Sequence, residues 1–181
     1  TYYHNQELAH EVEQLRGEIL EGIRRYGIVK DEEFGEMYAY ETDGMGHYNL
    51  MDDANVPSLL SLPWLGWCDK GDPLYQNTRK FILSKKNPFY FEGSAACGIG
   101  SPHTPENYIW HIGLTMQGLT SRDEEERTRL LETLLSTDNG CEVMHEGFDS
   151  SDPSQFTREW FAWANSLFAL YVLDLKKGGE I

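Results

Sequence analysis

The chain of 181 residues carries a net charge of −15, and 40% of its residues are hydrophobic. This composition suffices for one sizeable core, so residues 1–181 are expected to form a single domain. The acidic balance argues against nucleic acid and anionic membranes as partners, because phosphate groups are bound by Lys and Arg. No apolar run is long enough to span a bilayer.

Aromatic residues make up 13% of the chain. They suit a neutral ligand with flat apolar faces, such as a sugar, although aromatic side chains also serve as plain core. The cysteines are odd in number and lack metal-type spacing, which favours a reduced compartment; they are Cys68, Cys97 and Cys141. Residues 1–4 contain neither Met nor a signal-peptide pattern. We therefore expect a cytoplasmic location. No metal and no cofactor are expected either.

The first expected element is a helix over about residues 5–26. Its apolar residues recur every three or four positions, which places them on one face. This stripe comprises Leu8, Val12, Leu15, Ile19 and Ile23. A hairpin-type turn is then indicated at Asp43-Gly44.

Two acids and an amide are concentrated on the loop before Pro57, namely Asp52, Asp53 and Asn55. Pro57 favours the first turn of a short helix over 59–62, and an acid placed before it can cap that helix. Capping needs one acid rather than two, and all three side chains could also hydrogen-bond sugar hydroxyls. Both interpretations stay open at this point.

Further helices are expected over about 72–84, 106–119, 121–136 and 153–177. Trp64 lies on a loop before the first of these, and His103 follows a glycine-rich loop before the second. The helix over 106–119 is apolar nearly all round and should be buried, and most of the aromatic stripe of the last helix should be core. Consecutive helices joined by irregular polar loops and short ribbons predict an all-α fold of about six helices, part of an α/α toroid or barrel.

Glu146 lies between a histidine and a glycine on the loop before the last helix. Limited solvation and nearby hydrogen-bond donors can set the proton affinity of such a carboxylate for acid or base catalysis. The alternative is a loop carboxylate that only caps the next helix.

Several stretches of the sequence resemble glycoside hydrolase family 125, the metal-independent exo-α-1,6-mannosidases. The resemblance runs in the same order from Tyr38 to Phe168, and motifs of ten residues or more argue against a chance match. The stretches are residues 51–60 (Met-Asp-Asp-Ala-Asn-Val-Pro-Ser-Leu-Leu), 100–104 (Gly-Ser-Pro-His-Thr), 110–117 with 119–121, 144–146 (Met-His-Glu) and 157–168 (Thr-Arg-Glu-Trp-Phe-Ala-Trp-Ala-Asn-Ser-Leu-Phe).

The resemblance implies an (α/α)6 barrel, a six-hairpin toroid, that removes non-reducing-end α-1,6-linked mannose with inversion. The family's general base maps onto Glu146. Its general acid lies in an Arg-Pro-Ser-Asp-Asp motif that this sequence lacks and that should precede Thr1. The chain is then the C-terminal part of a larger catalytic domain and is expected to be inactive alone. Family members commonly have Pro where His111 stands, and often Ser or Asn where Gly147 stands.

The candidate substrate-binding residues are Asp53, Asn55, His103, Trp110, His145 and Trp64, with Trp110 or Trp64 offering an apolar face to a mannose-containing oligosaccharide. A second interpretation is a sugar-binding fragment that does not cleave. A third is a metal hydrolase built from His103, His145, Asp53 and Glu146. The third is weak, because the metalloprotease helix motif needs a second His three residues after His145-Glu146.

Overall fold

The computed structural model describes residues 4–181. The observation that residues 1–4 lack Met and a signal-peptide pattern therefore falls mostly outside the described residues. Within residues 4–181, five helices and nine short strands follow one another. The helices are α1 (Gln6–Tyr26), α2 (Pro73–Ile82), α3 (His111–Thr120), α4 (Glu124–Ser136) and α5 (Ala162–Gly178). No helix in this part of the chain is both long and apolar enough to cross a membrane.

The strands form four small antiparallel sheets. They are β1 (Ile28–Asp31) with β2 (Gly35–Tyr38), β3 (Glu41–Thr42) with β4 (Tyr48–Asn49), β5 (Tyr90–Glu92) with β6 (Cys97–Ile99), and the three-stranded β7 (Tyr108–Trp110), β8 (Gly147–Asp149) and β9 (Phe156–Thr157). The expected all-α fold of about six helices, part of an (α/α)6 barrel, is therefore wrong for the described residues. The loops between the helices satisfy their backbone groups by pairing with one another, which helical periodicity alone does not predict.

Two predicted helices begin later than expected. Residues 108–110 form β7 rather than the start of a helix, because Asn107 has a left-handed backbone (φ 68°) and a run of Tyr, Ile and Trp favours a strand. Likewise the last helix begins at Ala162 rather than near Pro153, since β9 and the left-handed Arg158 (φ 45°) come first. The short helix expected over 59–62 is a series of turns.

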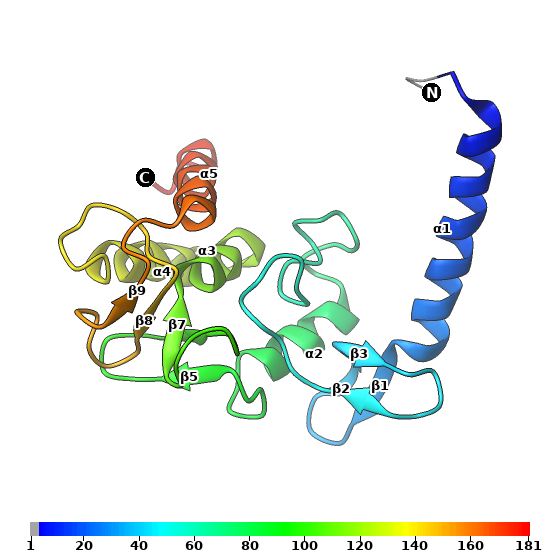
Figure 1. Cartoon of the computed structure of the whole chain (residues 1–181), viewed down its shortest axis with the longest axis horizontal. Coiled ribbons are helices and arrows are strands. Elements are labelled where there is room, and N and C mark those ends of the chain that lie inside the picture. Colours follow the sequence, from blue (N-terminus) through cyan, green and yellow to red (C-terminus); the bar gives the residue numbers. More distant parts are fainter. Residues whose placement is uncertain (1–3) are drawn as a thin grey trace.

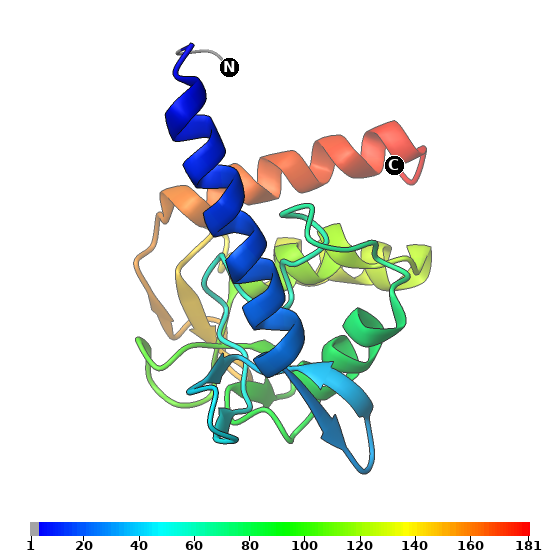
Figure 2. The ribbon, with the colours of Figure 1, turned by 90° about the vertical axis from the view of Figure 1, so that its right-hand side faces the viewer.

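Helix α1 agrees closely with its predicted bounds. The Asn5 side chain accepts a hydrogen bond from the Leu8 backbone N–H (3.0 Å), which caps the helix. The helix projects away from the rest of the chain (Figures 1 and 2) and has no buried residue. Its apolar stripe stays in water, with Leu8, Val12, Leu15 and Ile19 each more than half exposed.

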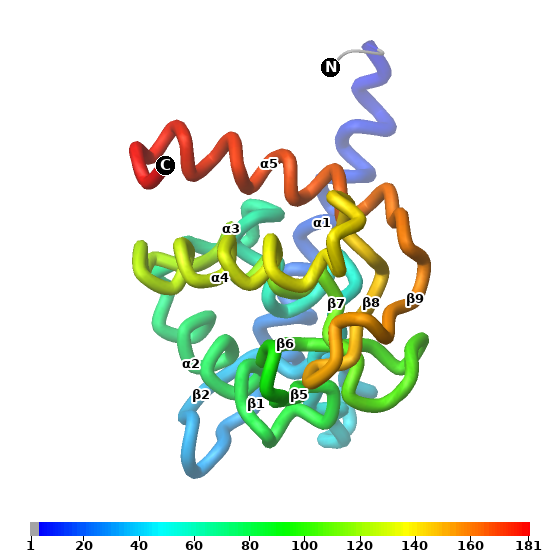
Figure 3. The backbone as a smooth tube through the Cα atoms, turned by 90° about the vertical axis from the view of Figure 1, so that its left-hand side faces the viewer, coloured from blue at the N-terminus to red at the C-terminus, as the bar shows by residue number. Residues whose placement is uncertain are grey.

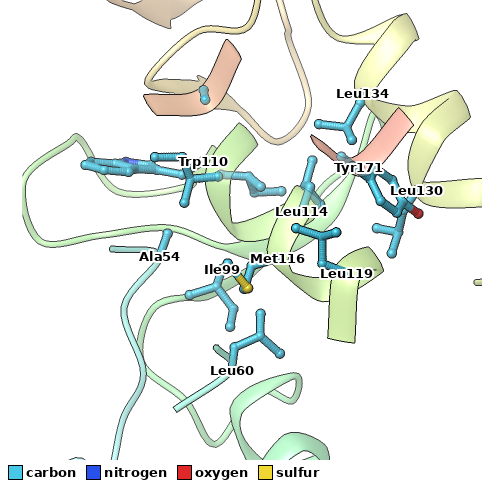
Figure 4. Close-up of a cluster of buried hydrophobic side chains, with 14 of the residues drawn as sticks. Ala54, Leu60, Ile99, Trp110, Leu114, Met116, Leu119, Leu130, Leu134 and Tyr171 are labelled. Atoms are coloured by element: carbon cyan, nitrogen blue, oxygen red, sulfur yellow. The ribbon is translucent and has the colours of Figure 1, made fainter. Parts of the chain in front are cut away.

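Part of the core lies where α5 packs on α3, which runs beside α4 (Figure 3), and the same cluster extends to residues of α2 and β2. Helix α3 is buried nearly all round, as predicted. Gly118 on α3 lies against Tyr171 on α5, and the Tyr171 hydroxyl donates to the Arg127 carbonyl on α4 (2.6 Å). Figure 4 shows Tyr171 and Trp110 at opposite ends of one apolar cluster. The same core therefore fixes both the helices and the side chain of Trp110.

Candidate active site

The three-stranded sheet places Glu146 at one end of its middle strand, beside residues that are distant in sequence. Gly147 opposes Trp110 on β7 and Thr157 on β9. Glu146 directly precedes β8 and Arg158 directly follows β9, so the two lie side by side. A Cβ at Gly147 would lie 2.9 Å from Cδ1 of Trp110, so the glycine allows the indole to approach the strand.

A cavity of about 750 Å³ opens at this end of the sheet. Four of the predicted site residues line it together: Asn55, His103, Trp110 and Glu146. The remaining lining residues are Arg158, Trp160, Phe161, Ala162 and Trp163. A carboxylate among aromatic side chains is an arrangement that can hold a sugar ring and act on it.

The Glu146 side chain is mostly buried, with 13% of its surface exposed. Its Oε1 atom lies 3.3 Å from Nε of Arg158, whose own side chain is 66% exposed. The Glu146 backbone N–H donates to the carbonyls of Thr157 (3.2 Å) and Arg158 (3.4 Å). Glu146 is thus held by β9 and faces the cavity rather than capping α5.

Trp110 combines a fixed position with a surface on the cavity. Only 2% of its surface is exposed, and its Nε1–H donates to Thr104 Oγ1 (2.9 Å). Its ring meets Phe161 edge to face at 6.0 Å. His103 is exposed at the rim of the same cavity. Both residues therefore line the cavity, Trp110 from a fixed position and His103 from the rim.

Asp52 and Asp53 have different partners. Asp52 is fully buried, and its two oxygens accept from the backbone N–H groups of Leu59 (2.8 Å) and Leu60 (2.9 Å). Burial raises its pKa to about 7, against the opposing effect of these donors. Asp53 Oδ1 accepts from the Asn55 backbone N–H (2.7 Å) and side-chain Nδ2 (2.8 Å). Asp52 therefore holds the turns at Leu59 and Leu60, where the sequence predicted a capped helix, while Asp53 holds Asn55, which lines the cavity.

His145 and Trp64 do not reach the cavity. His145 is fully buried, stacked on Phe156 at 4.0 Å, and its ring nitrogens lie by the carbonyls of Glu159 (2.6 Å) and Asp138 (3.1 Å). Trp64 is 43% exposed on the loop before α2, outside the cavity lining. Neither side chain is placed to contact a ligand in this cavity. His145 instead anchors the loop that carries Glu146.

The tautomer of His111 follows from its partners. Its Nδ1 accepts from the His145 backbone N–H (2.8 Å). The Thr137 hydroxyl donates to the Thr133 carbonyl (2.8 Å), so its oxygen accepts from His111 Nε2–H (3.0 Å). Burial, and secondarily the neighbouring His145, lowers the pKa of His111 to about 3. The ring is therefore neutral and bridges α4 to the loop of Glu146.

This neutral histidine should make stability depend on pH. Between its ordinary pKa near 6.5 and its folded pKa of about 3, the unfolded chain binds a proton that the folded chain excludes. The contribution of His111 to the free energy of unfolding should then be complete above pH 6.5. It should fall as pH drops, by up to about 1.4 kcal/mol per pH unit. His111→Asn keeps an acceptor near the Nδ1 position without titrating.

The test compares urea unfolding of the wild type and His111→Asn at pH 7, 6 and 5. The wild type should lose stability relative to the variant as pH falls. Because both proteins contain Asp52, its titration cancels in the difference. A difference that stays constant over this range would contradict the account.

Sequence reasoning missed five residues of the cavity, namely Arg158, Trp160, Phe161, Ala162 and Trp163. Residues after Pro153 were expected to continue one buried aromatic helix face, yet Trp160 and Trp163 are 64% and 61% exposed. The left-handed backbone at Arg158 turns the chain between β9 and α5. One signal in the sequence could have indicated these residues. Three aromatic residues, Trp160, Phe161 and Trp163, follow closely after the strand-forming pair Phe156-Thr157.

The metal-hydrolase alternative finds no support in the geometry. Within residues 4–181, no three His, Cys, Asp or Glu side chains come together in a set that could hold a metal ion. Both ring nitrogens of His145 already face carbonyl oxygens.

Comparison with known proteins adds three findings. Residues 1–173 match the family model described as metal-independent alpha-mannosidase (GH125). The Meiotically up-regulated gene 157 protein of Schizosaccharomyces pombe (strain 972 / ATCC 24843) is 51% identical over 158 residues, which are 87% of this chain and 31% of that protein.

A solved structure is also similar. It is a Streptococcus pneumoniae chain from a widely distributed family of metal-independent alpha mannosidases, in a non-productive substrate complex with alpha-1,6-mannobiose. The TM-score is 0.92 at 46% identity, over 94% of this chain and 40% of that one. The chain thus spans well under half the length of either relative.

Proposed function

Because the chain belongs to the family of metal-independent α-mannosidases, GH125, we propose that it forms part of the catalytic domain of an inverting exo-α-1,6-mannosidase. The observation that carries this is the carboxylate of Glu146 in a cavity lined by aromatic side chains. The alpha-1,6-mannobiose bound to the similar Streptococcus pneumoniae chain supports the linkage. Substrates are mannose-containing oligosaccharides with that linkage.

Glu146 acts as the general base. Its carboxylate takes a proton from a water molecule, the water oxygen bonds to the anomeric carbon, and the bond from that carbon to the leaving oxygen breaks. A general acid gives its proton to the leaving oxygen at the same time. Because the water attacks the face opposite the leaving group, the configuration inverts and no glycosyl-enzyme forms.

The general acid comes from polypeptide outside this sequence. Among the described residues that line the cavity, Glu146 is the single carboxylate, whereas inversion needs two, roughly 6.5–9.5 Å apart. The short coverage of both relatives supports a larger catalytic domain. The exposed stripe of α1 is then a surface that packs within that domain, since apolar stripes of this kind are normally covered.

One observation favours a second function. A cavity with one carboxylate and several aromatic rings also suits a sugar-binding fragment that does not cleave. The two functions differ in whether mannose is released.

The test is an assay of mannose release by the complete catalytic domain. It should hydrolyse α-1,6-mannobiose in the presence of EDTA and leave α-1,2- and α-1,3-mannobiose largely intact. The 181-residue chain alone should bind weakly, release no mannose and associate in solution through its exposed apolar faces. Robust hydrolysis by the 181-residue chain would contradict the proposal that the general acid comes from polypeptide outside this sequence. Binding of α-1,6-mannobiose by the complete domain without release of mannose would favour the sugar-binding function.

The loop around Asn55 provides a second prediction. Asn55→Ala and Asp53→Ala should each lower kcat/KM about 10- to 100-fold, because losing a buried or charge-assisted hydrogen bond costs roughly 1–3 kcal/mol. Asp53→Ala acts by releasing the Asn55 side chain. Asn49→Ala removes an exposed amide outside the cavity and is the matched control. An unchanged kcat/KM with a lowered melting temperature would make both residues purely structural.

A further inference from the structure

Arg158 contacts Glu146 through both its backbone and its side chain. The pairing of β8 with β9 extends to Gly147 and Thr157, so the residues just beyond it lie together. The Arg158 carbonyl accepts from the Glu146 N–H (3.4 Å), and its Nε lies 3.3 Å from Glu146 Oε1. A displacement of Arg158 would therefore move both ends of Glu146.

The backbone at Arg158 is unfavourable for an arginine. Its φ of 45° lies in the left-handed region, which residues other than glycine seldom adopt. Such conformations persist where surrounding contacts hold them, and they concentrate at functional sites. Here the guanidinium lies over the Phe161 ring at 5.5 Å. The Phe161 N–H in turn donates to the Met144 carbonyl (3.1 Å), two residues before Glu146.

Stability does not explain this arrangement. The contact uses one nitrogen of a side chain that is 66% exposed, and exposed ion pairs contribute little to folding. The arginine instead directs one carboxylate oxygen, Oε1, toward itself, which leaves Oε2 for a water molecule. A general base needs such a fixed orientation, because small misplacements of a reacting group cost large factors in rate.

We infer that Arg158 is a positioning residue that orients the Glu146 carboxylate for proton abstraction from water. The inference rests on the proposed function, since it assigns Arg158 a task only if Glu146 is the base. Arg158 then raises the rate of turnover and is dispensable for folding.

The experiment uses the complete catalytic domain and α-1,6-mannobiose. Arg158→Met keeps an unbranched stem over Phe161 and removes the guanidinium, and Arg158→Lys keeps the charge on a different geometry. Arg129→Met, at an exposed position on α4, is the matched control. Arg158→Met should lower kcat about 10- to 100-fold, with KM and the melting temperature nearly unchanged. Arg158→Lys should recover part of kcat, and Arg129→Met should match the wild type.

A double-mutant cycle separates action through Glu146 from an independent role. In the Glu146→Gln background, Arg158→Met should cause no further loss, because residues that act as a unit are not additive. A full additional loss in that background, or a loss confined to KM, would overturn the inference. If Glu146→Gln has a low kcat and Arg158→Met has the kcat of the wild type, the inference about Arg158 is wrong and the proposed function stands. Normal turnover of Glu146→Gln would remove the proposed function and the inference with it.

Discussion

Glu146→Gln in the complete catalytic domain is expected to lower kcat about 10²–10⁴-fold with little change in KM. Removing a general base costs this much because its effect is exerted in the transition state. The amide keeps the shape of the carboxylate but cannot accept a proton from water. The melting temperature should hardly change, since the lost ion pair to Arg158 is largely exposed on the arginine side.

A matched control lies thirteen residues further along the chain. Glu159 has an exposed side chain, and the loop uses its backbone carbonyl to hold His145. Glu159→Gln therefore makes the same chemical change without touching that contact, and its kcat should equal that of the wild type. Near-normal turnover of Glu146→Gln, combined with lowered thermal stability, would show that Glu146 is a structural carboxylate.

Gly118→Ala is expected to lower the free energy of unfolding substantially. A Cβ at this position would lie 2.4 Å from both Cζ and Oη of Tyr171. The tyrosine cannot move away freely, because it is fully buried and its hydroxyl donates to the Arg127 carbonyl. Overpacking of this kind costs about 1–3 kcal/mol, which urea unfolding measures as a lower midpoint with an unchanged slope.

The control for this substitution is Gly17→Ala on α1. No atom lies within 4 Å of a Cβ built at Gly17, so only helix propensity changes. The variant should gain helix content by circular dichroism and lose no stability, because Ala is favoured over Gly in a helix by roughly 0.5–1 kcal/mol. Equal destabilisation by both substitutions would mean that the contact of Gly118 with Tyr171 is not the cause.

The elements governed by local periodicity could be read from the sequence. The bounds of α1 follow from its regular apolar stripe, its capping Asn5 and the Gly27 that ends it. The burial of α3 follows from apolar residues on all its faces. These features depend on neighbours within a few positions, which a single sequence contains.

The three-stranded sheet could not be read in this way. Strand β7 pairs with residues about forty positions later, and its three residues carry no signal that outweighs the helical pattern following them. The late starts of α3 and α5 have this origin, and the sheet is one of the four that make the all-α prediction wrong. The position of Arg158 beside Glu146 was hidden for the same reason, because it depends on the pairing of β8 with β9.

The candidate site was predicted in part. Sequence motifs brought attention to Asn55, His103, Trp110 and Glu146, and the structure gathers these four around one cavity. The motif around Glu146 could not tell which neighbour faces the cavity, because this depends on how the chain enters β8, the middle strand of the sheet. His145 points into the core instead, where Phe156 covers it.

The anomer released first from α-1,6-mannobiose tests the central claim most directly. Proton NMR of a fresh reaction with the complete catalytic domain should show β-mannose before mutarotation produces the α-anomer. Glu146 as a general base on an attacking water requires this result. If α-mannose forms first, the reaction retains configuration, and Glu146 does not act as proposed.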